Sequence, residues 1–411
     1  MSRREQIRAL IRQEMAGFPE LEHDASTGLP LQVVPFGPEE VIAATERMLD
    51  TWVTMGPEVY AFEDEYAAWC GAKHGVMCNS GSSANLLMLA GMVETGRLKR
   101  GDEVLVPAVG WSTSLFPVEQ VGLVPVLVDV EPDTLCLCPA RAAEAITPRT
   151  RAALAVHLLG MPTNWEALEA LGLEVLEDAC AAPGAERGGR RAGQMGRAAT
   201  FSFFFSHHIT SFEGGVIVTD DADLADAMRS LRAHGWVRER TDKQALVAAS
   251  PEIDERFLFV STGYNLRPTE LSGAVARVQL KRLDGFLARR QANHRRWCEL
   301  LADLPVQVFP EVPGATSAAF AFAILLPEGI DRRTVQAHLE AHNIATRPIS
   351  GSNLARQPAF ARIPGARVSG PLPVADAVHT RGFFVGNSHA FGDAHGRLLR
   401  ERLAEALRIA Q

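Results

Sequence analysis

Short apolar runs alternate with longer amphipathic segments from about residue 59 to residue 235. Several runs are nearly continuous in apolar residues, which is typical of strands buried on both faces of a sheet. These predicted strands are Gly75–Cys78, Glu103–Pro107, Pro125–Val130, Ala152–His157, Leu173–Leu176, Thr200–Phe205 and Gly215–Thr219. The predicted helices between them are Ser83–Val93, Thr113–Val121, Asn164–Leu171 and Ala222–Arg232. The alternation predicts an α/β sheet with helices on both sides.

After residue 265 the amphipathic segments lengthen. Pro268–Leu283 and Phe286–Leu301 predict two helices that join at Asp284-Gly285. The remaining predicted elements are a strand near Ala318–Leu326, a helix near Asp331–His342 and a last helix near His395–Ala410. We therefore predict an N-terminal arm over residues 1–30, a large α/β domain over 31–285 and a small C-terminal α+β domain over 286–411.

Composition and charge narrow the class of protein. The chain has 411 residues, of which 47% are apolar and 22% are charged, as in ordinary globular proteins. The formal net charge of −8 argues against nucleic acid or an anionic membrane as the main partner. The longest apolar run, Ala318–Leu326, is too short to span a bilayer, and the N-terminus lacks the apolar core of a signal peptide. We therefore expect a cytoplasmic protein.

The cysteines and histidines do not form a recognisable metal motif. None of the six cysteines forms a Cys-x-x-Cys pair, and the twelve histidines show no His-Glu-x-x-His spacing. We therefore expect neither a disulfide framework nor a metal site.

Two strand ends carry residues that could hold a cofactor. In CNSGSSANLLML, Ser82 and Ser83 stand where a strand turns into a helix, so backbone N–H groups and hydroxyls could bind phosphate. Taken alone, an ordinary helix cap is the better interpretation. In LEVLEDACAAPGA, Glu177 and Asp178 end a buried strand, where a carboxylate could pair with a protonated ring nitrogen. A helix-capping or surface acid is equally compatible.

Three further segments offer side chains of the same kind. Trp111 follows another strand end and could stack on a ring, although core packing is the simpler interpretation. The turn FSFFFSHH contains Ser202, Ser206 and His207. Taken alone, His207 is better interpreted as a hydrogen-bonded histidine of the core or the turn. The loop GYNLRPTE adds Asn265 and Arg267 before a helix. Each signal is weak alone, but their order along one chain is informative.

The order of these motifs resembles that in the nucleotide-sugar aminotransferases and dehydratases. These are fold-type I enzymes that use pyridoxal phosphate (PLP). The resemblance runs from about Leu31 to the C-terminus. The matching stretches are Thr54–Gly56, Asn79–Met88, Gly101–Thr113, Ser206–Thr210, Glu213–Gly215, Leu231–Arg238, Gly263–Pro268 and Arg347–Asn353. It implies an aspartate aminotransferase-like fold, in which a large mixed-sheet domain binds PLP and a small α+β domain follows.

The resemblance also implies roles for individual residues. It assigns cofactor binding to Gly81, Ser82, Ser83, Trp111, Asp178, Ser202 and Asn265. It also implies a homodimer, in which Asn265 reaches the cofactor phosphate of the neighbouring subunit. Substrate binding falls to Met55, Gly56, Ser206, His234, Arg238, Arg267 and Arg347. The catalytic position, a lysine in the aminotransferases, is His207.

A histidine at that position changes the expected chemistry. An imidazole cannot form the Schiff base that the lysine forms, but it can move protons near neutral pH. The resemblance therefore implies non-covalent pyridoxamine phosphate (PMP) and removal of the C3 hydroxyl from a nucleotide-linked 4-keto-6-deoxy sugar. GDP-4-keto-6-deoxy-D-mannose is the expected substrate, L-glutamate the expected amino donor, and ammonia is released.

Two alternatives remain open at this point. The chain could be a sugar aminotransferase with an atypical base, or a relative that binds sugar nucleotide without turnover. A resemblance to iron–sulfur dehydrases that also have histidine at this position would place their cluster cysteines between about Trp236 and Ser250. This segment contains no cysteine, so a cluster is not expected. Ala181 and Ala345 stand where acidic residues are expected in the histidine-bearing branch, which leaves the sugar open.

Overall fold

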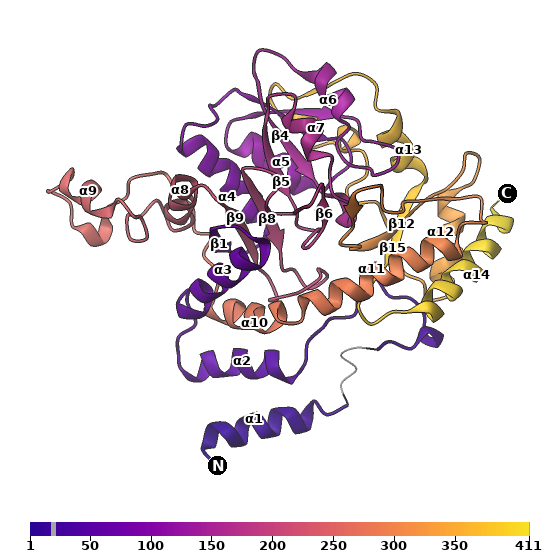
Figure 1. The fold of residues 1–411 in the computed structure, drawn as a ribbon, viewed down its shortest axis with the longest axis horizontal. Helices are drawn as coiled ribbons and strands as arrows, with labels where there is room; N and C mark the ends of the chain where they lie inside the picture. The colour runs from indigo at the N-terminus through magenta and orange to yellow at the C-terminus, as the bar shows by residue number, and fades with distance from the viewer. Residues whose placement is uncertain (18–21, 411) are drawn as a thin grey trace.

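The computed structural model describes residues 1–17 and 22–410, and a mixed eight-stranded sheet forms its centre (Figure 1). The strand order is β1-β9-β8-β5-β4-β2-β3-β14. Only β9 runs antiparallel to its neighbours, β8 and β1. The strands are β1 (His74–Cys78), β2 (Glu103–Pro107), β3 (Val124–Val128), β4 (Thr150–Val156), β5 (Glu174–Asp178), β8 (Ala198–Ser202), β9 (Gly215–Thr219) and β14 (Arg367–Val368). The seven strands predicted from the apolar runs and the fold type are confirmed.

Helices cover both faces of this sheet because its strands are apolar on both sides. On β2, Val104 and Val106 pack in one core with helices α4, α5 and α8, whereas Leu105 packs in another with α6 and α7. Helix α3 covers the second face near β1 and β9. The helix bounds are α3 (Pro57–Cys70), α4 (Gly81–Glu94), α5 (Ser112–Gln120), α6 (Pro139–Ala145), α7 (Trp165–Glu169) and α8 (Ala222–Arg232).

A second, antiparallel sheet forms in the C-terminal third of the chain, with the order β10-β12-β15-β13. Its strands are β10 (Gln307–Val308), β12 (Ala321–Leu325), β13 (Thr346–Pro348) and β15 (Gly382–Gly386). Helices α11, α12 and α14 pack against it through a core that includes Trp297, Leu339 and Leu403. The helices of this part are α10 (Glu270–Leu280), α11 (Leu283–Leu300), α12 (Arg332–Ala341), α13 (Pro373–Arg381) and α14 (Asp393–Ile409).

The prediction that the two long helices join at Asp284-Gly285 is wrong. Helix α10 ends at Leu280 and α11 begins at Leu283, so Asp284 and Gly285 lie inside the first turn of α11. Asp284 is an acidic residue in that first turn, where a carboxylate interacts favourably with the helix dipole. The Asp-Gly pair therefore marks a helix start here rather than a turn.

The remaining elements lie around these two sheets. Helix α1 (Arg3–Glu14) lies along α2 (Pro38–Leu49) through the ion pairs Arg4–Asp50 and Arg12–Glu39, and α9 (Lys243–Ala248) stands away from the body (Figure 1). A small sheet, β11-β6-β7, joins β6 (Glu186–Arg187), β7 (Arg190–Arg191) and β11 (Ala315–Thr316). The 3-10 turns are Ala25–Thr27, Leu158–Gly160, Glu255–Phe257, Leu354–Arg356 and Phe360–Arg362.

Two further observations bear on the sequence expectations. In the described part of the chain, no helix has both the length and the apolar character needed to cross a membrane. The domain boundaries at residues 30 and 285 stay a prediction, and β14, although it lies in the C-terminal part, joins the large sheet beside β3.

Candidate active site

A cavity of about 930 Å³ lies at the carboxyl ends of the parallel strands, where α/β sheets bind their ligands. Residues that follow β1, β2, β4, β5 and β8 line one side of it, and the second sheet closes the other side through Phe320, Ala321 and Arg347. The predicted site residues that line it are Gly81, Ser82, Trp111, Asp178, Ser202, Ser206, His207 and Arg347. We call it the first cavity.

The N-terminus of α4 points its first turn at this cavity. Ser80 caps the helix, because its hydroxyl accepts the backbone N–H of Ser83 at 3.1 Å. Ser82 is exposed, and its hydroxyl donates to Thr113 Oγ1 at 3.2 Å. A side chain at Gly81 would collide with Ser202, whose Cβ would lie 2.5 Å from the added Cβ. The turn therefore presents backbone N–H groups and hydroxyls of Ser82 and Ser202 to an anion.

Ser83 is placed differently from its neighbours. It does not line the first cavity, and its hydroxyl accepts a hydrogen bond from Ser80 at 3.0 Å. Its assignment to the cofactor stays a prediction, and the cap residue Ser80, which the sequence analysis did not select, holds the turn in place.

Strand alternation separates Glu177 from Asp178. Glu177 points away from the cavity lining and accepts hydrogen bonds from His157 at 3.0 Å and from the N–H groups of Met195 and Gly196. Asp178 lines the first cavity, as expected for the next residue of a strand. Of the two acids, only Asp178 is therefore available to a ligand.

Neutral donors alone surround the buried Asp178 carboxylate. Its Oδ2 accepts from Asn85 Nδ2 at 2.9 Å and from Ser114 Oγ at 2.6 Å, and its Oδ1 accepts the N–H of Cys180 at 3.2 Å. In the described parts of the chain, no lysine or arginine forms an ion pair with it. A buried carboxylate of this kind suits a cationic partner supplied by a ligand.

Asn85 and Ser114 were not selected from the sequence. A signal for Asn85 exists, because it is a polar residue on the buried face of an otherwise apolar helix. Trp111 is the N-cap residue of α5, and it keeps 59% of its surface exposed while lining the cavity. Its accessible ring is suited to stacking on a planar ligand rather than to core packing.

His207 lies in the turn after β8, with its ring 5.1 Å from that of Phe320. Its Nδ1 is buried and has no hydrogen-bond partner among the described residues. Burial lowers the pKa of His207 to about 4; the Asp178 carboxylate opposes this shift and the Arg290 cation adds to it. The imidazole is therefore neutral at physiological pH, with one nitrogen unengaged.

His208, the next residue, lies in the protein core and bonds to the backbone. It is fully buried, and its Nε2 bonds to the carbonyl oxygen of Ala318 at 2.8 Å. Burial lowers the pKa of His208 well below its ordinary value. Of the two neighbouring histidines, only His207 reaches the first cavity.

A buried arginine and a glutamine support the His207 turn from behind. Gln32 Nε2 donates to the carbonyl oxygen of His207 at 3.2 Å, and Gln32 Oε1 accepts from Arg290 Nη2 at 2.9 Å. Arg290 also donates to the carbonyl oxygens of Phe320 and Asn387. Burial lowers the pKa of Arg290 to about 9. The sequence carries no local signal for this network, because its members are far apart along the chain.

The other predicted site residues lie around a second cavity of about 820 Å³. Met55, Arg238, Asn265 and Arg267 line it, and Gly56 follows Met55 at the start of α3. The structure therefore does not bring these residues to His207 within one chain.

Asn265 and its neighbours are held together at this second cavity. Arg267 Nε donates to Asn265 Oδ1 at 3.0 Å, and Arg267 Nη2 lies 3.4 Å from His234 Nε2. Arg238 stacks on the ring of Trp236, with 3.9 Å between its guanidinium carbon and the ring centroid. His234 has a φ of 66°, a left-handed conformation that costs energy for a residue with a side chain. Exposed cations are thus concentrated on one surface.

Ala181 and Ala345, the two departures noted in the sequence, both line the first cavity. Acidic side chains at these places would point negative charge into the space that faces Arg347 and His207. Alanine at both positions removes this negative charge from the lining.

Comparisons with known proteins agree with this geometry. The model of the DegT/DnrJ/EryC1/StrS aminotransferase family matches residues 36–398. GDP-4-keto-6-deoxy-D-mannose 3-dehydratase of Yersinia pseudotuberculosis is 38% identical over 360 residues, which cover 85% of this chain and 91% of the relative. The crystal structure of a His-to-Asn variant of GDP-4-keto-6-deoxymannose-3-dehydratase with bound GDP-perosamine superimposes with a TM-score of 0.87 at 34% identity, covering 92% of this chain and 100% of the other.

The Escherichia coli GDP-4-keto-6-deoxy-D-mannose-3-dehydratase with bound hydrated PLP superimposes with a TM-score of 0.85 at 33% identity, covering 93% of this chain and 99% of the other. The resemblance inferred from the sequence motifs is thereby confirmed. The chain belongs to the DegT/DnrJ/EryC1/StrS aminotransferase family.

Proposed function

We propose that this chain is a PLP- and PMP-dependent dehydratase that removes the C3 hydroxyl of a nucleotide-linked 4-keto-6-deoxy sugar. The observation that carries the proposal is the neutral His207 in the first cavity, at the place where the aminotransferases keep a lysine. No lysine belongs to the lining of this cavity in the described parts of the chain. GDP-4-keto-6-deoxy-D-mannose is the first candidate substrate, because it is named in the dehydratase that is 38% identical and in the solved structure that superimposes with a TM-score of 0.87.

The residues of the first cavity fit the cofactor. A protonated pyridine nitrogen supplies the cationic partner that Asp178 lacks, while Asn85 and Ser114 hold the carboxylate in position. The helix start at Gly81 and Ser82, together with Ser202, suits the cofactor phosphate. Trp111 is placed to cover the ring.

PMP supplies an amine that can react with the 4-keto group of the sugar and a ring that can take up electrons. His207 is the group that removes a proton at the cofactor's exocyclic carbon, because it lines the cavity and its imidazole is neutral. It cannot hold the cofactor covalently, so binding depends on Asp178, Trp111 and the α4 turn. The Gln32–Arg290 network fixes the backbone of the His207 turn.

The net reaction balances with L-glutamate as the reductant. The sugar loses the oxygen at carbon 3 and gains a hydrogen there, and glutamate becomes 2-oxoglutarate with release of ammonia. Equal amounts of deoxygenated sugar, 2-oxoglutarate and ammonia are therefore expected.

We also propose that the active form is a homodimer in which the second cavity of one subunit faces the first cavity of the other. Both cavities have exposed apolar side chains in their linings, which suits burial at an interface: Trp111, Phe204 and Phe205 at the first, and Met48, Val53 and Tyr60 at the second. In this arrangement Asn265 reaches the cofactor phosphate, and Arg238 and Arg267 bind the diphosphate of the sugar nucleotide.

The test is to incubate the pure protein with PLP, L-glutamate and GDP-4-keto-6-deoxy-D-mannose, and to follow the sugar nucleotide by mass spectrometry. A product that is lighter by one oxygen, with stoichiometric ammonia, supports the proposal. An amino-sugar product would instead indicate transamination with an atypical base. If adding PLP causes no spectral change, the chain is a sugar-nucleotide-binding relative without turnover. If PLP is converted to PMP but the sugar is unchanged, the assay is repeated with dTDP-, CDP- and UDP-linked substrates.

A further inference from the structure

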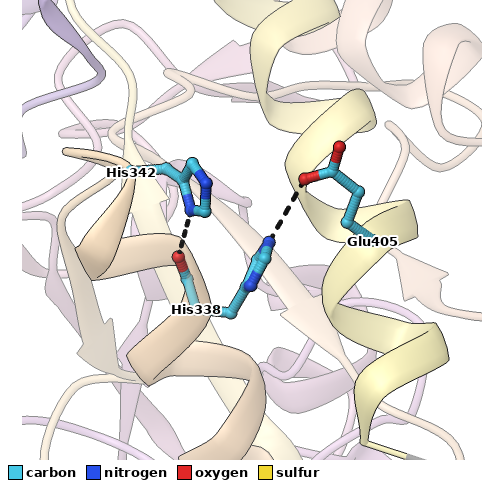
Figure 2. Close-up of side chains that lie close together, drawn as sticks. All are labelled: His338, His342 and Glu405. Carbon is cyan, nitrogen blue, oxygen red and sulfur yellow. Dashed lines mark hydrogen bonds and ion pairs between the residues drawn. The ribbon is translucent and has the colours of Figure 1, made fainter.

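A cluster of metal-ligating side chains lies outside both cavities, where helices α12 and α14 pack together (Figure 2). His338 lies on α12, His342 is its C-terminal cap residue, and the two are one turn apart on the same face. Glu405 projects toward them from α14 (Figure 2). All three side chains are partly buried.

The donor atoms of these residues are close enough to bind one cation. They all lie within 4.8 Å of one another, and His338 Nε2 is 3.3 Å from Glu405 Oε2. Two nitrogens or oxygens on one metal at about 2.0–2.1 Å are separated by no more than about 4.2 Å. A small rotation of the side chains, together with loss of the proton between His338 Nε2 and Glu405, therefore brings all three donors onto one ion.

Hydrogen bonding prepares His342 for this role. Its Nδ1 bonds to the carbonyl oxygen of His338 at 2.8 Å, and because a carbonyl only accepts, Nδ1 carries the proton. The Nε2 atom is then the one with a free lone pair. A backbone carbonyl that fixes the tautomer and the ring orientation is the usual support of a metal-binding histidine.

We propose that His338, His342 and Glu405 bind a divalent transition-metal cation, with Zn²⁺ as the first candidate. Two imidazoles and one carboxylate form a ligand set that Zn²⁺ and related cations prefer, with water at the fourth position. Ca²⁺ and Mg²⁺ are disfavoured because they require oxygen ligands. The ion would join the last turn of α12 to the final helix of the chain.

Arg402 competes with a metal cation for Glu405, and a second carboxylate near Arg402 can take the place of Glu405. Arg402 Nη1 donates to both oxygens of Glu405, at 3.1 and 2.9 Å, and so competes with a metal for that carboxylate. Its Nη2 lies 3.5 Å from Glu401, an exposed carboxylate. Arg402 can therefore keep an ionic partner when Glu405 turns to the metal. Removing Arg402 is expected to strengthen metal binding.

The site is independent of the proposed reaction. None of its residues lines either cavity. Its expected effect is on stability, because a ligand that binds only the folded state shifts the unfolding equilibrium.

The experiment uses the full-length protein with its cofactor after treatment with a chelator. Co²⁺ is titrated and its visible ligand-field absorbance is recorded, followed by displacement with Zn²⁺. One equivalent is expected to bind, and Zn²⁺ is expected to raise Tm by at least about 2 °C. His342→Ala and Glu405→Gln are each expected to weaken Co²⁺ binding at least tenfold, whereas Arg402→Ala strengthens it.

His74→Ala is the matched control, because His74 is also partly buried but lies on β1 of the other sheet. This variant is expected to bind Co²⁺ like the wild type. Absence of binding by the wild type, or equal binding by wild type and His342→Ala, would overturn the proposal. If His342→Ala does not fold, His342→Gln serves the same purpose, because it keeps a long polar side chain without the imidazole donor.

Discussion

At the scale of single residues, two adjacent histidines have different roles: the first is the proposed base and the second stabilises the fold. His207 lines the first cavity with a buried and unengaged Nδ1, whereas His208 bonds to Ala318 and does not reach the cavity. We predict that His207→Asn lowers turnover by about 10²–10⁴-fold, the range for loss of a general base, while PMP binding changes only a few-fold. Steady-state assays and titration of cofactor absorbance measure the two effects.

His208→Asn is the matched control for this variant. It is expected to lower Tm, because it disturbs a buried hydrogen bond, and to leave turnover per folded molecule within a few-fold of the wild type. If His207→Asn keeps nearly full turnover, the assignment of His207 as the base is wrong.

The lowered pKa of His207 predicts a pH effect on stability. Its pKa is about 4 in the folded protein against an ordinary value of 6.5, so the unfolded chain binds more protons between these values. The free energy of unfolding of the cofactor-free protein should therefore fall as the pH drops from 6.5 to 4. Denaturant titrations of the wild type and His207→Asn isolate this contribution. The variant should lose less stability over that window, and equal losses would contradict the lowered pKa.

The sequence identified the residues that follow strand ends, because strand ends are visible in the apolar pattern. The apolar pattern alone could not choose between Glu177 and Asp178, because that choice depends on the face of β5 from which each side chain projects. The family resemblance selected Asp178. Gln32 and Arg290 were missed altogether, because the hydrogen bonds from Arg290 to Gln32 and from Gln32 to His207 join positions far apart in the chain. The His338–His342 spacing carried no signal without Glu405, which only the packing of two helices supplies.

At the scale of elements, two serines at the start of α4 have different roles, helix capping by Ser80 and proposed ligand binding by Ser82. Ser80 and Ser82 both line the first cavity, but the Ser80 hydroxyl accepts the N–H of Ser83, whereas the hydroxyl of the exposed Ser82 bonds only to the Thr113 side chain among the described residues. We predict that Ser80→Ala lowers the free energy of unfolding by about 1 kcal/mol through loss of the helix cap. Ser82→Ala should leave the stability of the cofactor-free protein within about 0.5 kcal/mol and weaken only cofactor binding. Denaturant titration and PLP titration of both variants distinguish these effects. A stability loss of the same size in both would refute the division.

The element bounds show the same limit of sequence reasoning. The start of α4 lies at Gly81 rather than Ser83, because the cap is set by one hydrogen bond that the apolar pattern does not contain. Strand β14 has only two residues and pairs with β3 across a long loop, so no local pattern could identify it. The long, strongly apolar strands were predicted well because burial on both faces leaves a continuous signal.

At the scale of the whole molecule, the site residues are divided between two cavities of one chain. His207 belongs to the first cavity and Asn265 to the second, and both cavities include exposed apolar side chains in their linings. If two subunits complete each other's sites, a His207→Asn subunit paired with an Asn265→Ala subunit contains one intact site and one doubly altered site. Random pairing of equal amounts should therefore restore about a quarter of the wild-type activity.

The measurement is to unfold, mix and refold the two inactive variants together, and to compare turnover with that of each variant refolded alone. Sedimentation of the wild type should show a dimer under the same conditions. A mixture that stays as inactive as its components, although sedimentation shows that mixed dimers form, would mean that each subunit builds its site alone. The cations around Asn265 would then need another explanation. Recovery would place Arg238 and Arg267 beside the partner's cofactor, where a sugar diphosphate can bind between two positively charged guanidinium groups.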